Sequence, residues 1–259
     1  MKILNNLINK NNYDRMQEIV NYLKNVGIKY NSQLVDSSKG LENIIIDYSK
    51  NKRYVLVIAH YDCVQGSQGA NDNASGVEIL LNVLADQFIQ NLSVKFVFTA
   101  LEEEGGIGCS YYLKKEGINN IYSVINVDSC GWGDSIVIKN HSIFDDMVLQ
   151  NVLREVKGIF FTKFLPCGDD TICEEFDVPT IAISTMKERD YQCFKKIGDT
   201  QDCVLSKEEL ENLQREYFTL DLFKTMHCGT MDDFKNINVE ILEKVQMVVK
   251  KILALLLCN

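Results

Sequence analysis

The sequence contains very little proline and no low-complexity tract. Only Pro166 and Pro179 occur in 259 residues, and neither an internal repeat nor a stretch rich in Pro, Gly or Ser interrupts the chain. Flexible linkers between domains have such compositions. We therefore expect a single domain over residues 1–259, with 46% hydrophobic residues to form its core.

Long apolar segments are also missing. The run Ile252–Cys258 is far shorter than the roughly 20 residues that span a bilayer. The first residues, MKILNNLINKNN, contain no apolar stretch of about 7–15 residues of the kind found in secretory signals. These features predict a cytoplasmic protein without a membrane partner.

Positive charge is in the minority, with 27 Lys and Arg against 36 Asp and Glu and a net charge of −9 at pH 7. An acidic surface repels phosphate backbones and anionic lipids. The composition therefore predicts no nucleic-acid partner, and it leaves the oligomeric state open.

Closely spaced cysteine pairs are absent, although the chain has nine cysteines. No C-x-x-C motif of a zinc ribbon or iron–sulfur cluster occurs, and the number is odd. Free thiols in a reducing compartment are the simplest interpretation. Cys167 and Cys173, six residues apart, are the pair of most interest.

What the chain does have is an alternation of helical and strand-like segments. Apolar residues recur at helical spacing in four segments and form short continuous runs in five others. This pattern predicts an α/β fold, in which helices cover both faces of a sheet. The expected helices are 14–26, 75–88, 109–115 and 238–257, and the expected strands are 54–59, 94–100, 122–127, 135–138 and 180–184. Residues 186–225 look irregular, and we expect them to form one wall of a substrate pocket.

Histidine and carboxylate residues stand at the ends of three of these expected strands. His60 ends the first, Glu102 and Glu103 follow the second, and Asp128 ends the third. Sites in open α/β sheets form beyond the carboxyl ends of the strands. The sequence therefore brings metal-binding residue types to one edge of the sheet.

Each of these residues also has an ordinary structural interpretation when it is taken alone. A single histidine can end a strand, Asp72 lies in an N-D-N segment that favours turns, and Glu102–Glu104 could be a solvated acidic loop. Together they favour a metal site, since a carboxylate such as Asp72 can bridge two cations. Asp62, two residues after His60, is well placed to orient its imidazole.

The series of motifs resembles a zinc metallopeptidase family that includes bacterial leucyl-type aminopeptidases, glutamate carboxypeptidases and glutaminyl cyclases. The family pattern runs H-x-D, G-A-x-D-N-A-S-G, E-E-x-G-x-x-G-S, Asp and His. The corresponding stretches here are HYD, GANDNASG, EEEGGIGC, VINVDSCG and MHCGTMDD. The resemblance implies a three-layer α/β/α sandwich with a mixed, mostly parallel central sheet.

The same resemblance implies roles for individual residues and two divalent metal ions, most simply zinc. His60 and Asp128 would bind one ion, Glu103 and His227 the other, and Asp72 would bridge them. Glu102 would be the general base for a metal-activated water, and Asp62 would support His60.

Three departures from the family pattern stand out. Cys109 replaces the usual serine of the third motif. The usual aspartate four residues after the last histidine is Met231, with Asp232 one place later, so the support of His227 is open. Gly168-Asp169-Asp170 stands where relatives often have S-D-H.

The leading hypothesis is a metal-dependent exopeptidase, most simply an aminopeptidase that acts on peptides or amino-acid amides. One alternative is an acyltransferase similar to the glutaminyl cyclases, although these usually lack the full D-N-A-S-G stretch. Another is an inactive homologue that binds peptides, against which the retention of Glu102 beside Glu103 argues. The sequence leaves the side-chain preference and the physiological metal open.

Overall fold

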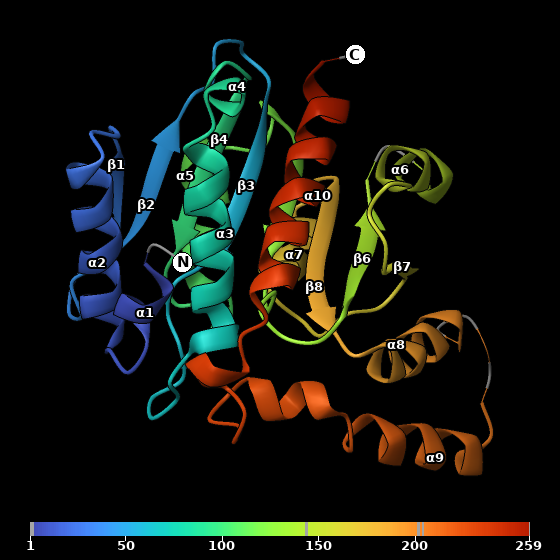
Figure 1. Cartoon of the computed structure of the whole chain (residues 1–259). Coiled ribbons are helices and arrows are strands. Elements are labelled where there is room, and N and C mark those ends of the chain that lie inside the picture. Colours follow the sequence, from blue (N-terminus) through green and yellow to red (C-terminus); the bar gives the residue numbers. More distant parts are fainter. Residues whose placement is uncertain (1–2, 143–144, 201–202, 204, 259) are drawn as a thin grey trace.

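The computed structural model describes residues 3–142, 145–200, 203 and 205–258, and these form one eight-stranded sheet with helices on both faces (Figure 1). The strand order is β1-β2-β4-β3-β5-β8-β6-β7. Four of the seven pairings are parallel, namely β4–β3, β3–β5, β5–β8 and β6–β7. The mixed, mostly parallel sheet of an α/β sandwich is thus confirmed.

The five expected strands are all present, and three further strands widen the sheet. The bounds are β1 Asn31–Asp36, β2 Leu41–Asp47, β3 Tyr54–His60, β4 Val94–Thr99, β5 Ile121–Val127, β6 Ser135–His141, β7 Ile159–Thr162 and β8 Thr180–Met186. The antiparallel hairpin β1–β2 extends one edge, and the short β7 forms the other (Figure 1). β1 and β7 are polar or only partly buried, which explains why continuous apolar runs did not reveal them.

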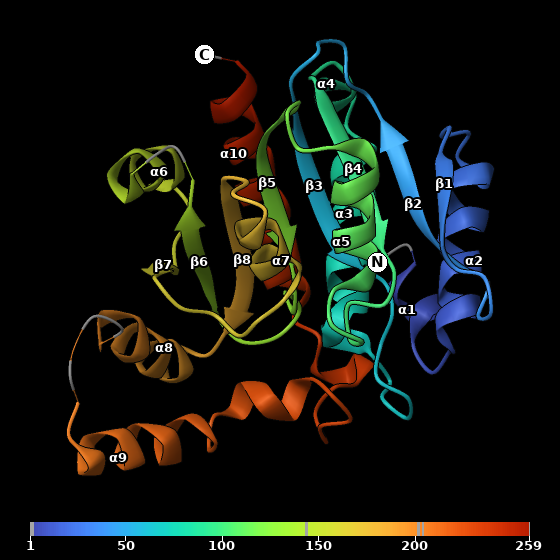
Figure 2. The same cartoon turned by 180° about the vertical axis from the view of Figure 1, so that it is seen from behind.

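Helices cover the two faces unequally. One face carries α1 Leu4–Leu7, α2 Asn12–Asn25, α3 Ser75–Leu84, α4 Gln87–Gln90, α6 Asp146–Leu153 and α10 Val239–Leu257. Figure 2 shows the opposite face, with α5 Ile107–Glu116, α7 Asp169–Glu175 and α8 Glu188–Thr200; α9 Lys207–Tyr217 packs against α8.

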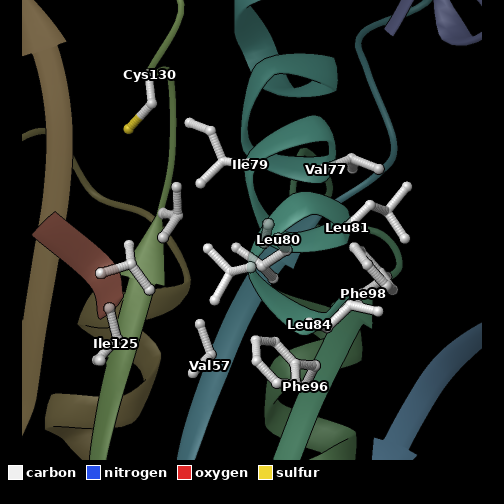
Figure 3. Close-up of a cluster of buried hydrophobic side chains, with 14 of the residues drawn as sticks. Val57, Val77, Ile79, Leu80, Leu81, Leu84, Phe96, Phe98, Ile125 and Cys130 are labelled. Carbon is white, nitrogen blue, oxygen red and sulfur yellow. The ribbon is translucent and has the colours of Figure 1, made fainter. Parts of the chain in front are cut away.

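Side chains of the central strands point alternately to the two faces of the sheet, so the protein has a hydrophobic core on each face. Val57 of β3 faces α3 and α10, whereas its neighbours Leu56 and Ile58 face α5 and α7. Figure 3 shows Val57 beside Leu80 of α3 and Phe96 of β4. Successive side chains of a strand point to opposite faces, so a strand buried on both sides needs apolar residues at nearly every position.

The expectation of an irregular segment between residues 186 and 225 was wrong. Most of it forms α8 and α9, and α9 begins with a capping box in which the Ser206 and Glu209 side chains satisfy each other's backbone N–H groups. The sequence signal was the S-x-x-E pattern itself. Among the described residues, no helix combines the length and apolarity needed to cross a membrane.

Candidate metal centre

The sheet topology brings the strand ends together as expected. His60 is the last residue of β3 and pairs in register with Thr99, three residues before Glu102. Asp128 directly follows β5, which lies on the other side of β3. Three adjacent parallel strands therefore deliver these side chains to one edge.

Asp72 lies in a tight buried turn at residues 70–74, in front of α3. Gly69 precedes the turn at φ 62°, and a Cβ there would lie within 2.8 Å of Cys63 and closer still to Arg15. Only glycine fits both the left-handed backbone and this close approach. The Asp72–Asn73 peptide bond is cis.

Two histidines from distant parts of the chain meet at Asp72. His60 Nε2 lies 3.2 Å from Asp72 Oδ1 and 3.3 Å from Asp128 Oδ1. His227 Nε2 lies 3.5 Å from Asp72 Oδ2 and 3.1 Å from Glu103 Oε2. Each oxygen of Asp72 thus faces a different group: the first group is His60 with Asp128, and the second group is His227 with Glu103.

Glu102 and Asp62 occupy positions beside these groups. Glu102 Oε2 lies 3.9 Å from His60 Nε2, so this carboxylate faces the first group without being part of it. Asp62 Oδ1 lies 3.5 Å from His60 Nδ1, and the two Asp62 oxygens accept hydrogen bonds from the backbone N–H groups of Glu102 and Glu103. Asp62 therefore connects the end of β3 to the glutamate loop, in addition to its expected contact with His60.

Burial and mutual proximity alter the protonation of the site. Burial raises the pKa of Glu102 to about 9 and also raises the pKa of Glu103. Burial opposes the charged form of His60, but the carboxylates of Glu102 and Asp128 outweigh it and raise the pKa of His60 well above its ordinary value. The hydrogen bond to Glu103 raises the pKa of His227 to about 9. Clustered carboxyl groups here hold protons that a cation would displace.

The donor set fits divalent cations of the zinc type. One ligand atom each from His60, Asp72 and Glu103 lie within 4.8 Å of one another. Asp72 Oδ2 and Glu103 Oε1 are buried without a hydrogen-bond partner, which is costly unless something else compensates them. Imidazole and carboxylate ligands are those of catalytic zinc sites. Among the described residues, the ion pairs of Asp72, Glu103 and Asp128 are all with the two histidines.

The aspartate after the last histidine has a different task from the one the motif suggested. Asp232 Oδ1 accepts a hydrogen bond from the backbone N–H of Asn71 at 2.7 Å, and Asp232 Oδ2 accepts one from Gly69 at 3.0 Å. It therefore holds the turn that carries Asp72 rather than the ring of His227. In the sequence, Met231 stands where the family has an aspartate and Asp232 follows one place later, so the support of His227 could not be assigned.

The sequence assigned no role to Asp169, which lies close to the site. Its side chain is buried, Oδ2 accepts a hydrogen bond from Thr99 at 2.5 Å, and Oδ1 has no partner. Burial raises the pKa of Asp169 to about 7. The sequence feature that could have pointed to Asp169 is its place in the Gly168-Asp169-Asp170 segment, where relatives often have S-D-H. Cys109, the replacement for serine, donates toward the Asp169 carbonyl and lies 3.6 Å from Cys173.

The chain belongs to peptidase family M28, whose model matches residues 43–215. That range contains every proposed site residue except His227. The match confirms the family expected from the motifs and supports the prediction of a metal-dependent hydrolase.

Curated relatives match over short segments. Aminopeptidase YwaD of Bacillus subtilis is 37% identical over 78 residues, which are 28% of this chain and 17% of that protein. Aminopeptidase Y of Saccharomyces cerevisiae is 36% identical over 94 residues, 34% of this chain and 18% of that protein. The chain thus covers less than a fifth of the length of these relatives.

Solved structures share the fold over most of the chain. BSAP, a zinc aminopeptidase from Bacillus subtilis, superposes with a TM-score of 0.61 at 16% identity, over 83% of this chain and 50% of that one. The glutaminyl cyclase of Bacteroides thetaiotaomicron gives a TM-score of 0.65 at 17% identity, over 96% and 94% of the two chains. At such identities the likeness establishes the fold alone.

Proposed function

We propose that this protein is an aminopeptidase with two co-catalytic zinc ions, which removes N-terminal residues from peptides. The observation that carries the proposal is the position of Asp72, whose two oxygens face two separate histidines. His60 and Asp128 would hold one ion and His227 and Glu103 the other, with Asp72 shared between them. The aminopeptidases among the relatives support the same activity.

The residues around this centre have distinct tasks in peptide hydrolysis. When bound, the cations would supply Lewis acidity, which polarises the scissile carbonyl and makes water easier to deprotonate. Glu102, beside the first group, is the general base that takes the proton from water and passes it to the leaving amine. Asp62 keeps Glu102 in place through its backbone N–H and orients His60.

The charge of the site favours a free N-terminal amine. Asp169 is buried and Glu102 and Asp128 are partly buried, and all three carboxyl groups interact electrostatically with His60. Among the described residues, no lysine or arginine forms an ion pair with any of the three. Once bound cations displace the protons of these carboxyl groups, the carboxylates that bind no metal would attract a cationic amine, whereas they would repel the carboxylate recognised by a carboxypeptidase.

The test compares one peptide in three forms with metal-loaded protein. We expect hydrolysis of the free peptide and of its C-terminal amide, and loss of hydrolysis after N-acetylation. Equal cleavage of the acetylated form, or loss of cleavage on C-terminal amidation, would replace the proposal with a carboxyl-end specificity.

A glutaminyl-cyclase activity is the second candidate, because the fold of such an enzyme is matched over nearly its whole length. Cyclisation of an N-terminal glutamine forms a bond from the amine nitrogen to the side-chain carbonyl carbon and releases ammonia. Mass spectrometry of a peptide beginning with glutamine separates the candidates. Hydrolysis shortens the peptide by a residue, whereas cyclisation removes only ammonia. Turnover of either kind would exclude an inactive binding homologue.

A further inference from the structure

Two buried cysteines meet between α5 and α7, on the face of the sheet that Figure 2 shows. Cys109 lies in the first turn of α5 and Cys173 lies in α7, and their sulfur atoms are 3.6 Å apart. Both side chains are almost completely buried. Cys167, which the sequence spacing had paired with Cys173, is exposed. The structure therefore gives Cys173 a different neighbour from the one that the sequence suggested.

A small movement would bring the two thiols into a covalent bond. All nine cysteines are free in the structure. A disulfide has an S–S length of roughly 2.05 Å, so the sulfur atoms of Cys109 and Cys173 would have to approach each other by about 1.5 Å. α5 and α7 already pack against each other. Formation of the bond therefore requires a closer approach of two neighbouring helices and no change of fold.

α5 is joined directly to the candidate metal centre. It begins at Ile107, four residues after Glu103. The loop between them, residues 102–106, is wound tightly, because the backbone N–H groups of Gly105 and Gly106 both donate to the carbonyl of Glu102. A displacement of the start of α5 would therefore be passed to Glu102 and Glu103.

α7 is joined to the same region at its own start. It begins at Asp169, whose buried side chain accepts a hydrogen bond from Thr99 at the end of β4. The S–H group of Cys109 donates to the backbone carbonyl of Asp169, with 3.7 Å between sulfur and oxygen. A disulfide would remove this proton and with it the hydrogen bond. Oxidation would therefore change the contact between the two helices as well as the distance between them.

We propose that Cys109 and Cys173 form a peroxide-sensitive dithiol site, whose disulfide displaces residues 102–106 and weakens metal binding at the candidate centre. This inference goes beyond the proposed peptidase activity and does not depend on which peptide is hydrolysed. It assigns a covalent modification to two residues that take no part in the hydrolysis.

The displacement would reach the metal ligands because the interior around the thiols is closely packed. Both cysteines lie in one cluster of buried side chains with residues such as Leu113 and Val178. The sulfur atoms therefore have no free space into which they could rotate, and the helices must move instead. Glu103 then loses part of its support. Changes in the groups that orient a metal ligand typically lower metal affinity by roughly 10–100-fold.

The reaction needs one molecule of peroxide for each pair of thiols. The contact with Cys173, burial and the charge of Asp169 raise the pKa of Cys109 well above its usual range, so Cys109 stays protonated and Cys173 reacts first. The Cys173 sulfur attacks a peroxide oxygen, the O–O bond breaks, and the released hydroxide takes the thiol proton to form water. The Cys109 sulfur then attacks the sulfenic sulfur, the S–O bond breaks, and hydroxide leaves with the Cys109 proton as a second water. Two thiols are oxidised, and the peroxide is reduced to two waters.

The experiment uses the full-length protein loaded with zinc, after an alkylating reagent has blocked the four exposed thiols, namely Cys167, Cys203, Cys228 and Cys258. Hydrogen peroxide is then added. Mass spectrometry of a digest made without reductant should show the peptides of Cys109 and Cys173 joined, with the loss of two hydrogen atoms. Competition with a chelator should show a zinc affinity at least about tenfold lower than in the blocked, unoxidised protein. A phosphine reductant, removed before the measurement, should restore the affinity.

Three variants separate this effect from general oxidation. Cys109→Ser and Cys173→Ala each remove one thiol of the pair and keep every methionine, so peroxide should leave their zinc affinity unchanged. Cys193→Ser is the matched control, because Cys193 is buried on α8 and lies in a different cluster of side chains. This variant should respond to peroxide as the wild type does.

Absence of the joined peptides would overturn the inference and leave the two thiols as small apolar side chains of the core. A disulfide that leaves zinc affinity unchanged, or an equal loss of affinity in Cys109→Ser, would overturn the link to residues 102–106. None of these measurements requires turnover, so a failure of the inference leaves the proposed function intact. A protein that binds no zinc before oxidation would contradict the proposed function and the effect on metal binding, and the joined peptides would still decide whether the dithiol site exists.

Discussion

Asp62 accepts a hydrogen bond from the backbone N–H of Glu102, although helices α3 and α4 and strand β4 lie between the two residues in the chain. The same carboxylate accepts a hydrogen bond from the backbone N–H of Glu103 and contacts the imidazole of His60. One buried side chain thus sets the relative positions of the proposed base and of ligands in both groups. This arrangement makes Asp62 the most informative residue to change outside the ligands themselves.

Asp62→Asn should weaken metal binding by about 10–100-fold, the usual cost of removing a partner that orients a ligand. The amide keeps one acceptor oxygen, so one of the two backbone N–H groups loses its bond. Competition with a chelator of known affinity measures the change. Asp36→Asn, in an exposed turn, serves as the control and should retain wild-type affinity. Unaltered affinity in Asp62→Asn would mean that the loop and His60 hold their positions without it.

Glu102→Gln should retain the fold and the metal while turnover falls by about 10²–10⁴-fold, the range for loss of a general acid–base group. Glu103→Gln should instead lower metal affinity, because its carboxylate contacts His227. Paired measurements of kcat and metal content distinguish the two effects. The reverse pattern would assign the base to Glu103 and remove Glu102 from that role.

The proposed pair of metal ions predicts that His227→Ala lowers the metal content from two ions per chain to one. The first group, His60 with Asp128, remains complete beside Asp72 in this variant, whereas the second group retains only the carboxylate of Glu103. Elemental analysis after dialysis gives the stoichiometry. Complete loss of metal would show that the two ions bind as one unit, and retention of two would exclude His227 as a ligand.

The metal-free protein should become less stable as the pH rises from about 5 to 9. Burial raises the pKa of Glu102 from 4.5 to about 9, so its contribution to the free energy of unfolding is present below pH 4.5 and is lost as the pH rises through 9. The raised pKa of His60 acts in the same direction above its ordinary value of 6.5.

Thermal unfolding across this pH range, with and without zinc, checks the expectation. The midpoint of the metal-free protein should fall, and Glu102→Gln should flatten the decline. With zinc the midpoint should rise relative to the metal-free protein as the pH increases, because metal binding competes with protons for the same ligands. A metal-free midpoint that rises toward pH 9 would contradict these pKa directions.

Local pattern was sufficient for the central part of the fold and for the placement of the candidate ligands at the strand ends. Continuous apolar runs revealed β3, β4 and β5, and chain order placed His60, Glu102 and Asp128 at their carboxyl ends. Parallel strands in one sheet bring these ends together whatever the loops between them do. The G-A-x-D-N-A-S-G motif likewise identified Asp72, because Gly69 and the small residues beside it are required by the turn.

Tertiary structure alone decided which distant residues meet. The pairing of His227 with Glu103, the hydrogen bonds of Asp232 to the Asp72 turn, and the contacts of Asp62 with both glutamates all depend on how loops close over the sheet. The attachment of α2 to the loop after β3, through the hydrogen bonds of Arg15 to the carbonyls of Tyr61 and Gly69, has the same origin. Periodicity in a sequence reports the face that a residue occupies within its own element. It carries no information about which separate elements come into contact, because packing across the whole molecule determines that choice.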